Sequence, residues 1–231
     1  ALQPMESPFR LDGKCAVVTG GTKGLGRAIV ESLASHGAVV HTCARTSADV
    51  DAAVAEWKTQ GLHVTGSVCD VACPASRASL AAEATQRFGG KLHILVSNVG
   101  FNIRKPTVDV TPDEYRRLMD TNLEATFALC QLFHPLLKAA GSSAVVFNSS
   151  VASLVSMQSG AVYAMTKGAI NILTKYLACE WAKDGVRVNA VAPWYINTPL
   201  AQQVLKHPEY SRAVTDRTPA GRGGEPHEGG S

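Results

Sequence analysis

Tyr163 and Lys167 stand four residues apart in a stretch whose apolar residues recur at helical spacing. That spacing places both side chains on one face of a helix. An ammonium group beside a phenol favours the phenolate, lowers the tyrosine pKa, and lets the hydroxyl exchange a proton with a carbonyl or alcohol oxygen. Ser150 ends a preceding apolar run, where its hydroxyl could hydrogen-bond the same oxygen. Taken alone, however, a tyrosine and a lysine at this spacing are more often a plain surface pair on a helix.

A second pattern, the glycine-rich turn Thr19–Gly26, could bind phosphate. It follows the apolar run Cys15–Val18 and precedes the helical pattern Arg27–Leu33. Glycines let the backbone approach a pyrophosphate, and the start of the following helix offers free N–H groups and a positive dipole end. The order strand, glycine turn, helix therefore predicts a dinucleotide site.

The elements that must position these groups alternate along the chain. Short apolar runs predict strands at Cys15–Thr19, Val39–Cys43, Val64–Val68, Ile94–Ser97, Ala144–Asn148 and Arg187–Ala192. Longer helical patterns separate them at Gly24–His36, Ala48–Gln60, Ala75–Phe88, Pro112–Ala140 and Ala161–Lys183. Nearly continuous apolar strands indicate a parallel sheet that is covered on both faces. The alternation predicts an α/β fold with a doubly wound parallel sheet of Rossmann type, in three α/β/α layers.

Composition limits the possible functions. The 231 residues suit one domain at residues 11–231, after an N-terminal extension at 1–10 whose first four residues precede Met5 and are consistent with a remnant of added sequence. A net charge of +3 without a basic run gives no reason to expect nucleic acid binding. No apolar stretch reaches the roughly 18 residues that span a bilayer, so we expect no membrane partner. Residues 221–231 read as a polar tail.

The six cysteines and seven histidines give no metal-binding spacing. Several of the cysteines lie inside apolar runs, which is typical of reduced, buried thiols in a cytoplasmic protein. We therefore expect no metal and a cytoplasmic location.

Together, the two patterns resemble the short-chain dehydrogenase/reductase family. That family has TGxxxGxG after its first strand, an Asn-Ala-Gly turn after its fourth, then Ser and Tyr-x-x-x-Lys. Here these elements are Thr19–Gly26, the turn at 98–100, Ser150 thirteen residues before Tyr163, and Lys167. The match runs in order from about residue 11 to about residue 226, and a further family asparagine corresponds to Asn122.

The resemblance implies a mechanism. Tyr163 would be the general acid/base, and Ser150 would stabilise the substrate oxygen. Lys167 would lower the tyrosine pKa and hold the nicotinamide ribose, while Asn122 would bind a relay water through its main chain. The expected catalytic residues are Asn122, Ser150, Tyr163 and Lys167.

The resemblance also implies a nicotinamide cofactor, and the charges favour NADPH. Members that prefer NAD carry an acid just after the second strand, whereas this chain has Arg45 there and Lys23 in the glycine turn. Asp49, the first acid, comes later. The expected cofactor contacts are Gly20, Thr22, Lys23, Gly24, Leu25, Gly26, Arg45, Asp70, Val71, Asn98, Gly100, Tyr163, Lys167, Pro193, Ile196 and Thr198.

The sequence departs from the family pattern at three places. Val99 is bulkier than the usual alanine and could tighten the cofactor cleft. Trp194 replaces a glycine beside the nicotinamide, and could narrow the site or cap the core. Relatives continue beyond Pro226 with a further helix and strand, so the fold is expected to lack its C-terminal strand.

Within the family, the chain most resembles plant tropinone reductases and their homologues of secondary metabolism. Stretches such as 42–45, 134–138 and 177–183 carry this likeness. It implies reduction of a compact, largely apolar cyclic ketone, such as an alkaloid or terpenoid carbonyl compound, beneath a helical lid around 199–218. The expected substrate contacts, besides Ser150 and Tyr163, are Ile103, Val151, Ser153, Val155, Gln158, Trp194, Tyr195 and Leu200.

Two alternatives stay open. One is a secondary-alcohol dehydrogenase working oxidatively with NAD(P), because equilibrium and cofactor ratio set the direction. The other is a scaffold that binds cofactor without catalysis, against which the intact catalytic residues argue. The family also pairs its fourth and fifth helices between subunits, so we expect a homodimer or homotetramer through Pro112–Ala140 and Ala161–Lys183.

Overall fold

A parallel sheet forms the centre of the molecule in the computed structural model, which describes residues 9–157 and 160–230. The strands are β1 (Cys15–Thr19), β2 (Val39–Ala44), β3 (Val64–Val68), β4 (Ile94–Ser97), β5 (Ser143–Asn148) and β6 (Val186–Val191). Their order is β3-β2-β1-β4-β5-β6, and each pair is parallel. The order reverses between β1 and β4, which is where ligands bind in open α/β sheets. The predicted doubly wound fold is confirmed.

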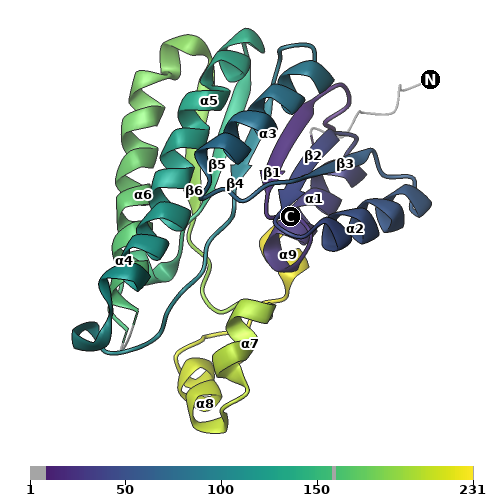
Figure 1. The fold of residues 1–231 in the computed structure, drawn as a ribbon. Coiled ribbons are helices and arrows are strands. Elements are labelled where there is room, and N and C mark those ends of the chain that lie inside the picture. The colour runs from purple at the N-terminus through teal and green to yellow at the C-terminus, as the bar shows by residue number, and fades with distance from the viewer. Residues whose placement is uncertain (1–8, 158–159, 231) are drawn as a thin grey trace.

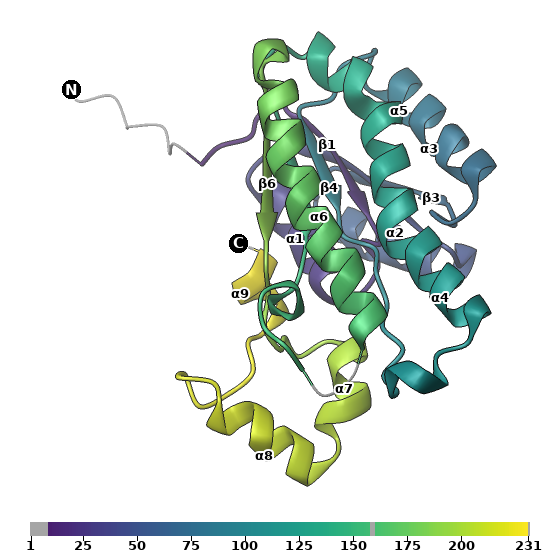
Figure 2. The ribbon, with the colours of Figure 1, turned by 90° about the vertical axis from the view of Figure 1, so that its left-hand side faces the viewer.

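Helices cover both faces of the sheet (Figures 1 and 2). Up to β6 the α-helices are α1 (Gly24–Ser35), α2 (Ser47–Thr59), α3 (Pro74–Arg87), α4 (Pro112–Leu118), α5 (Ala125–Ala139) and α6 (Ala161–Glu180). Side chains of α1 and α2 pack on one face, and those of α3, α5 and α6 pack on the other. Most ends lie within one residue of the predicted ones, and the largest difference is at α6, which stops at Glu180 rather than Lys183.

Strand β1 shows why the apolar runs fold this way. Ala16 and Val18 contact the α1–α2 cluster, Val17 contacts the α3–α5–α6 cluster, and all three are fully buried. Successive side chains of a strand point to opposite faces, so a strand between two helical layers must be apolar throughout. The buried strand β1 therefore holds the start of the polar glycine turn in a fixed position.

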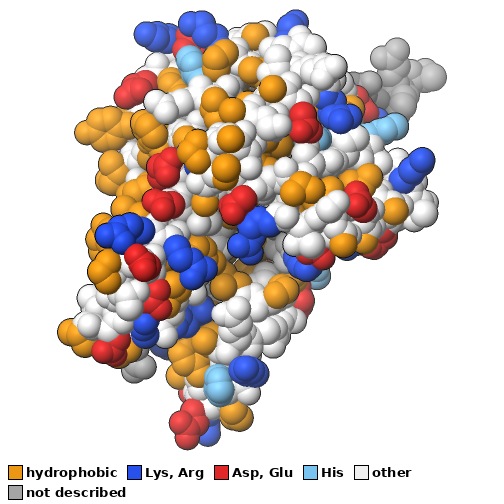
Figure 3. All heavy atoms as spheres, in the orientation of Figure 1, with side chains coloured by type: hydrophobic (Ala, Val, Ile, Leu, Met, Phe, Trp, Pro, Cys, Tyr) orange, Lys and Arg blue, Asp and Glu red, His pale blue; other side chains and the backbone are white. Residues whose placement is uncertain are grey.

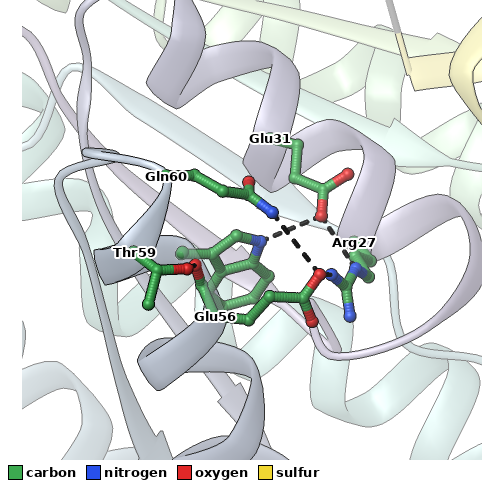
Figure 4. Close-up of polar contacts among 6 residues, drawn as sticks. Arg27, Glu31, Glu56, Thr59 and Gln60 are labelled. Atoms are coloured by element: carbon green, nitrogen blue, oxygen red, sulfur yellow. Dashed lines mark hydrogen bonds and ion pairs between the residues drawn. The ribbon is translucent and has the colours of Figure 1, made fainter.

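A polar cluster joins α1 to α2 beside the glycine turn (Figure 4). Glu31 accepts hydrogen bonds from Arg27 at 2.7 Å and from the buried Trp57 indole at 3.0 Å. Arg27 also pairs with Glu56, and its guanidinium carbon lies 5.7 Å from the Trp57 ring centroid. Because Arg27 lies one turn after the start of α1, the cluster fixes the direction of that helix.

The chain after β6 forms a separate group of short helices. These are α7 (Pro199–Leu205), α8 (Pro208–Asp216) and α9 (Pro226–Gly230). Helices α7 and α8 lie together beyond the sheet and confirm a helical pair in the predicted lid region (Figure 1). The expected polar tail is more ordered than predicted, because α9 packs against α1 and Gly224 pairs with Ile196 in an isolated parallel bridge.

A π-helical turn interrupts one predicted helix. The pattern Pro112–Ala140 predicts continuous helix, but Met119–Glu124 (η2) is π-helical and separates α4 from α5. Such insertions are frequent at functional sites, and this one contains Asn122. Among the described residues, no helix is long and apolar enough to cross a membrane, and no three His, Cys, Asp or Glu side chains gather as metal ligands. Residues 1–4, Met5 and Gln158, singled out from the sequence, lie outside this described part.

Candidate active site

The glycine turn after β1 forms a backbone cradle. A Cβ atom at residue 26 would lie 2.1 Å from the Gly20 carbonyl oxygen and 2.5 Å from Asn98 Nδ2, so only glycine fits. Gly24 has φ of +57°, which glycine adopts without strain. Lys23 precedes α1 and makes no side-chain cap, so the N–H groups of the first turn have no side-chain acceptor there. This cradle fits the pyrophosphate of a dinucleotide.

Asn98 ties the glycine turn to the catalytic end of the sheet. Its Nδ2 donates to the carbonyl oxygens of Thr19 at 3.0 Å and Gly20 at 3.3 Å. Its Oδ1 accepts from Asn148 Nδ2 at 2.9 Å. Val99 lies against the same turn, with Cγ2 2.9 Å from the point where a Cβ of residue 20 would sit. The Val99 side chain thus fills the space next to Gly20.

Asn122 is fully buried and holds the loop that follows β4. Its Oδ1 accepts from the Phe101 N–H at 3.1 Å, and its Nδ2 donates to the Phe101 carbonyl oxygen at 2.9 Å. Its own carbonyl oxygen accepts from the Thr126 hydroxyl at 3.0 Å. The side chain therefore positions the loop that carries residues 100–105.

The structure brings Ser150 and Tyr163 to the same cavity. A hydrogen bond from Ser150 lowers the pKa of the Tyr163 phenol, and Ser150 Oγ accepts from the Ala152 N–H at 3.1 Å. Burial raises the pKa of Tyr163, against the opposing effects of Ser150 and the positive charge of Arg104. The expected lowering by Lys167 does not dominate in this structure, where the lysine nitrogen lies 5.7 Å from the Tyr163 ring centroid.

Lys167 is a buried cation within the same group. Its Nζ donates to the Asn148 carbonyl oxygen at 2.6 Å, and the side chain is almost wholly buried. Burial lowers the pKa of Lys167 to about 8. Any Cβ at residue 100 would lie 3.3 Å from Nζ, so Gly100 leaves room for the ammonium. The arrangement holds a phenol, a hydroxyl and an amine around one space.

That space is a cavity of about 380 Å³. Thirteen predicted site residues line it: Leu25, Asn98, Gly100, Ser150, Val155, Tyr163, Lys167, Pro193, Trp194, Tyr195, Ile196, Thr198 and Leu200. Ile103, Val151 and Ser153 do not line it, and Asn122 lies behind it. Alternate residues of this loop line the cavity, so Asn102 and Arg104 contribute to it and Ile103 between them does not. The sequence analysis missed both, since no periodic pattern marks an irregular loop.

Trp194 both lines the cavity and packs against α7 and α8. Its indole N–H donates to Thr218 Oγ1 at 3.1 Å, and the ring packs edge-on against Tyr195 with centroids 4.8 Å apart. Tyr195 is hydrogen-bonded to Tyr210 of α8. Trp194 thus lines the site and also packs in a small core with residues of α7 and α8, as expected if it caps a core.

The other predicted cofactor residues lie around the ends of β1, β2 and β3. They are Gly20, Thr22, Lys23, Gly24, Gly26, Arg45, Asp70 and Val71. Lys23 Nζ pairs with Asp49 Oδ2 at 2.8 Å, whereas Arg45 is exposed and no carboxylate of the described residues pairs with it. Gly24 connects the two ends of the site, since a Cβ there would lie 3.3 Å from Thr198 Cγ2. The Thr198 hydroxyl itself caps α7 by accepting from the Ala201 N–H at 3.3 Å.

Comparison with known proteins agrees with this geometry. A family model described as short chain dehydrogenase matches residues 14–209. A tropinone reductase homolog of Arabidopsis thaliana is 54% identical over 95% of this chain and 83% of its own length. Another from that plant, described as chloroplastic, is 53% identical over 95% and 68%. The crystal structure of a gluconate 5-dehydrogenase from Burkholderia cenocepacia, in complex with NADP and tartrate, is 32% identical with a TM-score of 0.91, covering 96% of this chain and 86% of that one.

Proposed function

The chain belongs to the short chain dehydrogenase family, an NAD(P)-dependent oxidoreductase class that acts on CH–OH and C=O groups, and we propose that it is an NADPH-dependent reductase of a compact, largely apolar cyclic ketone. The observation that carries the proposal is that Ser150, Tyr163 and Lys167 line one cavity, which Leu25 of the glycine turn and Asn98 also line. Tropinone reductase homologues at about half identity support the ketone class.

The chain's own residues would move the proton. Tyr163 would donate its phenolic proton to the carbonyl oxygen, and burial, which raises the pKa of Tyr163, keeps the phenol protonated at neutral pH. Ser150, hydrogen-bonded to Tyr163, would bind the same oxygen as negative charge develops there. The cofactor would supply the hydride. Lys167 would hold the nicotinamide ribose hydroxyls from the floor of the cavity.

Replacing the phenol tests this role. Tyr163→Phe should lower kcat by about 10²- to 10⁴-fold, as expected for the loss of a general acid. Tyr115→Phe removes a hydroxyl from an exposed position of α4, away from the cavity, and should leave kcat unchanged. NADPH oxidation with a panel of cyclic ketones, followed by absorbance, measures both. Equal rates for wild type and Tyr163→Phe would refute the assignment.

NADPH is proposed from the charges after β1 and β2. Arg45 is exposed with a planar donor fork suited to a 2′-phosphate, and Lys23 stands on the glycine turn opposite it. The Burkholderia cenocepacia neighbour was solved with NADP, which supports the same choice. Arg45→Asp should weaken NADPH binding far more than NADH binding. Lys58→Asp, with the same charge change at the far end of α2, should alter neither. Similar losses for both cofactors in Arg45→Asp would contradict the phosphate assignment.

We also propose that α4, α5 and α6 join two copies of the chain. A groove on this face is lined by Met119, Leu123, Phe127, Ala169, Ile172, Leu173 and Tyr176, with Glu124 as the one charged residue of its described lining. Phe127, Ile172 and Tyr176 are 46%, 53% and 65% exposed, more than a soluble monomer usually leaves uncovered in one place. Hydrophobic side chains also gather along the margin of the molecule where Figure 1 draws α4 and α6 (Figure 3). Ile172→Asp should shift the sedimentation of a homodimer or homotetramer toward monomer.

All six cysteines are unpaired in the structure, which supports the proposal of a reducing, cytoplasmic location. Imaging of the tagged natural protein in its source cells would test that location directly.

A further inference from the structure

We propose that Arg104 selects a ketone that carries a carboxylate, so that the substrate is a compact cyclic keto acid. This inference rests on the function proposed above and deepens it by naming the charge of the substrate. A cyclic ketone without a charged group would need only a neutral, apolar cavity. The cavity of this protein is instead positively charged. Its described lining includes the cations Arg104 and Lys167 and neither aspartate nor glutamate.

The two cations differ in the partners that the protein gives them. Lys167 already donates to the Asn148 carbonyl oxygen at 2.6 Å. Arg104 is half-buried, and none of the ion pairs among the described residues involves it. Its neighbour Lys105 gives the contrast, because Lys105 Nζ pairs with Glu114 Oε2 at 2.6 Å and does not line the cavity. The charge of Lys105 is thus balanced by Glu114 outside the cavity, whereas the charge of Arg104 is not balanced by a carboxylate of the described residues.

The position of Arg104 is suited to substrate rather than cofactor. Arg104 lines the cavity together with Tyr163 and Tyr195, and its positive charge opposes the rise in the pKa of both phenols. Arg104 therefore shares the cavity with the proposed proton donor. A guanidinium presents five donors in a planar fork that matches a carboxylate. No ion pair among the described residues occupies that fork, so its donors are available to a ligand.

A second polar group in the cavity is also without a partner. Asn102 lines the cavity beside Arg104, and its Oδ1 is the one buried side-chain polar atom of the described residues that has no hydrogen bond. A buried acceptor left without a donor is costly, so a ligand that supplies one is favoured. We expect a hydroxyl or N–H of the same compound to meet it.

The remaining surface limits the size of that compound. Val155, Met157 and Leu200 give the substrate end an apolar wall. The residues assigned to the nicotinamide share the same cavity of about 380 Å³, so only part of it is open to substrate. A carboxylate on a single ring fits these limits. A cyclic amine that is protonated at neutral pH would bring a second positive charge toward Arg104 and is disfavoured.

Three ketones of similar shape test the charge directly. We would compare 4-oxocyclohexanecarboxylate, its neutral carboxamide and the cationic 1-methyl-4-piperidone, each with NADPH and the full chain. A charge-assisted hydrogen bond contributes about 1.5–3 kcal/mol, so kcat/KM should favour the carboxylate over the carboxamide by about 10- to 100-fold. The piperidone should be the poorest of the three. A carboxylate no better than the carboxamide would overturn the proposal.

Variants assign the preference to one residue. Arg104→Gln should bring the carboxylate-to-carboxamide ratio close to one, and Arg104→Lys, which keeps the charge without the fork, should give an intermediate ratio. Lys105→Gln removes the adjacent, neutralised cation and should leave the ratio as in the wild type. An equal fall in the ratio in Arg104→Gln and Lys105→Gln would attribute the preference to general charge and refute a role for Arg104 alone.

A binding measurement separates this inference from the proposed activity. Cyclohexanecarboxylate and cyclohexanecarboxamide cannot be reduced, and calorimetry with the NADP⁺-loaded chain gives their Kd. Tighter binding of the carboxylate that Arg104→Gln abolishes would support the anion site even if no ketone were reduced. Reduction of all three ketones with equal binding of the two ring compounds would leave the reductase standing and overturn the anion site.

Discussion

The two halves of the sheet present different kinds of surface at the ends of their strands. At the ends of β1, β2 and β3 the backbone forms the contact surface, and a Cβ on Gly26 would lie 2.1 Å from the Gly20 carbonyl oxygen. The charged side chains there, Lys23 and Arg45, are exposed. At the ends of β4, β5 and β6 the surface is made of side chains, and Lys167 is 3% exposed. A backbone surface suits a ligand common to a whole family, whereas a side-chain surface can change from one substrate to another.

Each half also contains one buried base, held in a different way. His41 on β2 has both ring nitrogens bonded, to Thr65 Oγ1 at 2.8 Å and to Ser67 Oγ at 2.6 Å. Lys167 bonds to one carbonyl oxygen and otherwise faces the cavity. Burial lowers the pKa of both, to about 4 for His41 and about 8 for Lys167. The base with both nitrogens satisfied has a structural role, and the base left open to the cavity is the one that can serve chemistry.

The largest loss of cofactor binding is expected when a side chain fills the space that Gly26 leaves open. Gly26→Ala places a methyl group against the Gly20 carbonyl and Asn98, so the turn must open and cofactor binding should fall below detection. Gly168→Ala provides the control, because a Cβ at that position of α6 meets nothing within 4 Å and alanine favours helix. Calorimetric titration with NADPH measures both, and urea unfolding checks that each variant folds. Wild-type affinity in Gly26→Ala would show that the turn is not a rigid cradle.

The buried histidine predicts acid sensitivity in the first half of the sheet. His41 stays neutral when folded because burial and the nearby Arg87 charge outweigh the attraction of Glu83. Its contribution to stability is complete above its ordinary pKa of 6.5 and is lost as the pH falls toward 4, amounting to about 3 kcal/mol. Urea unfolding at pH 7, 5.5 and 4.5 should show this loss in the wild type. His41→Gln should flatten the profile, and His63→Gln, at an exposed position, should not. An unchanged slope in His41→Gln would exclude His41 as the source.

The same contrast explains what the sequence could predict. The glycine turn and the Tyr163–Lys167 pair follow from local spacing, which fixes geometry within a strand-turn-helix or along one helix. The π-helical turn at Asn122 could not be predicted, because a one-residue insertion leaves the hydrophobic period of a long helix nearly intact. Ile103 was chosen where Asn102 and Arg104 line the cavity, since the direction of side chains in an irregular loop depends on distant partners. Side-chain surfaces in loops are thus the least predictable part of the site.

The smallest effect is expected for Asp49, in the half of the sheet where the backbone forms the surface. Asp49 pairs with Lys23 at 2.8 Å and so competes with a 2′-phosphate for the same ammonium. Both side chains are exposed, and exposed pairs contribute at most about 1 kcal/mol, so Asp49→Asn should tighten NADPH binding by about threefold and leave NADH binding unchanged. Asp51→Asn makes the same change two residues further along α2 and should have no effect. Raising the ionic strength should shrink the gain, because salt screens charges at the surface. If Asp49→Asn instead tightened NADH and NADPH equally, Lys23 would have to act on a group common to both cofactors, and its charge would belong to the pyrophosphate cradle.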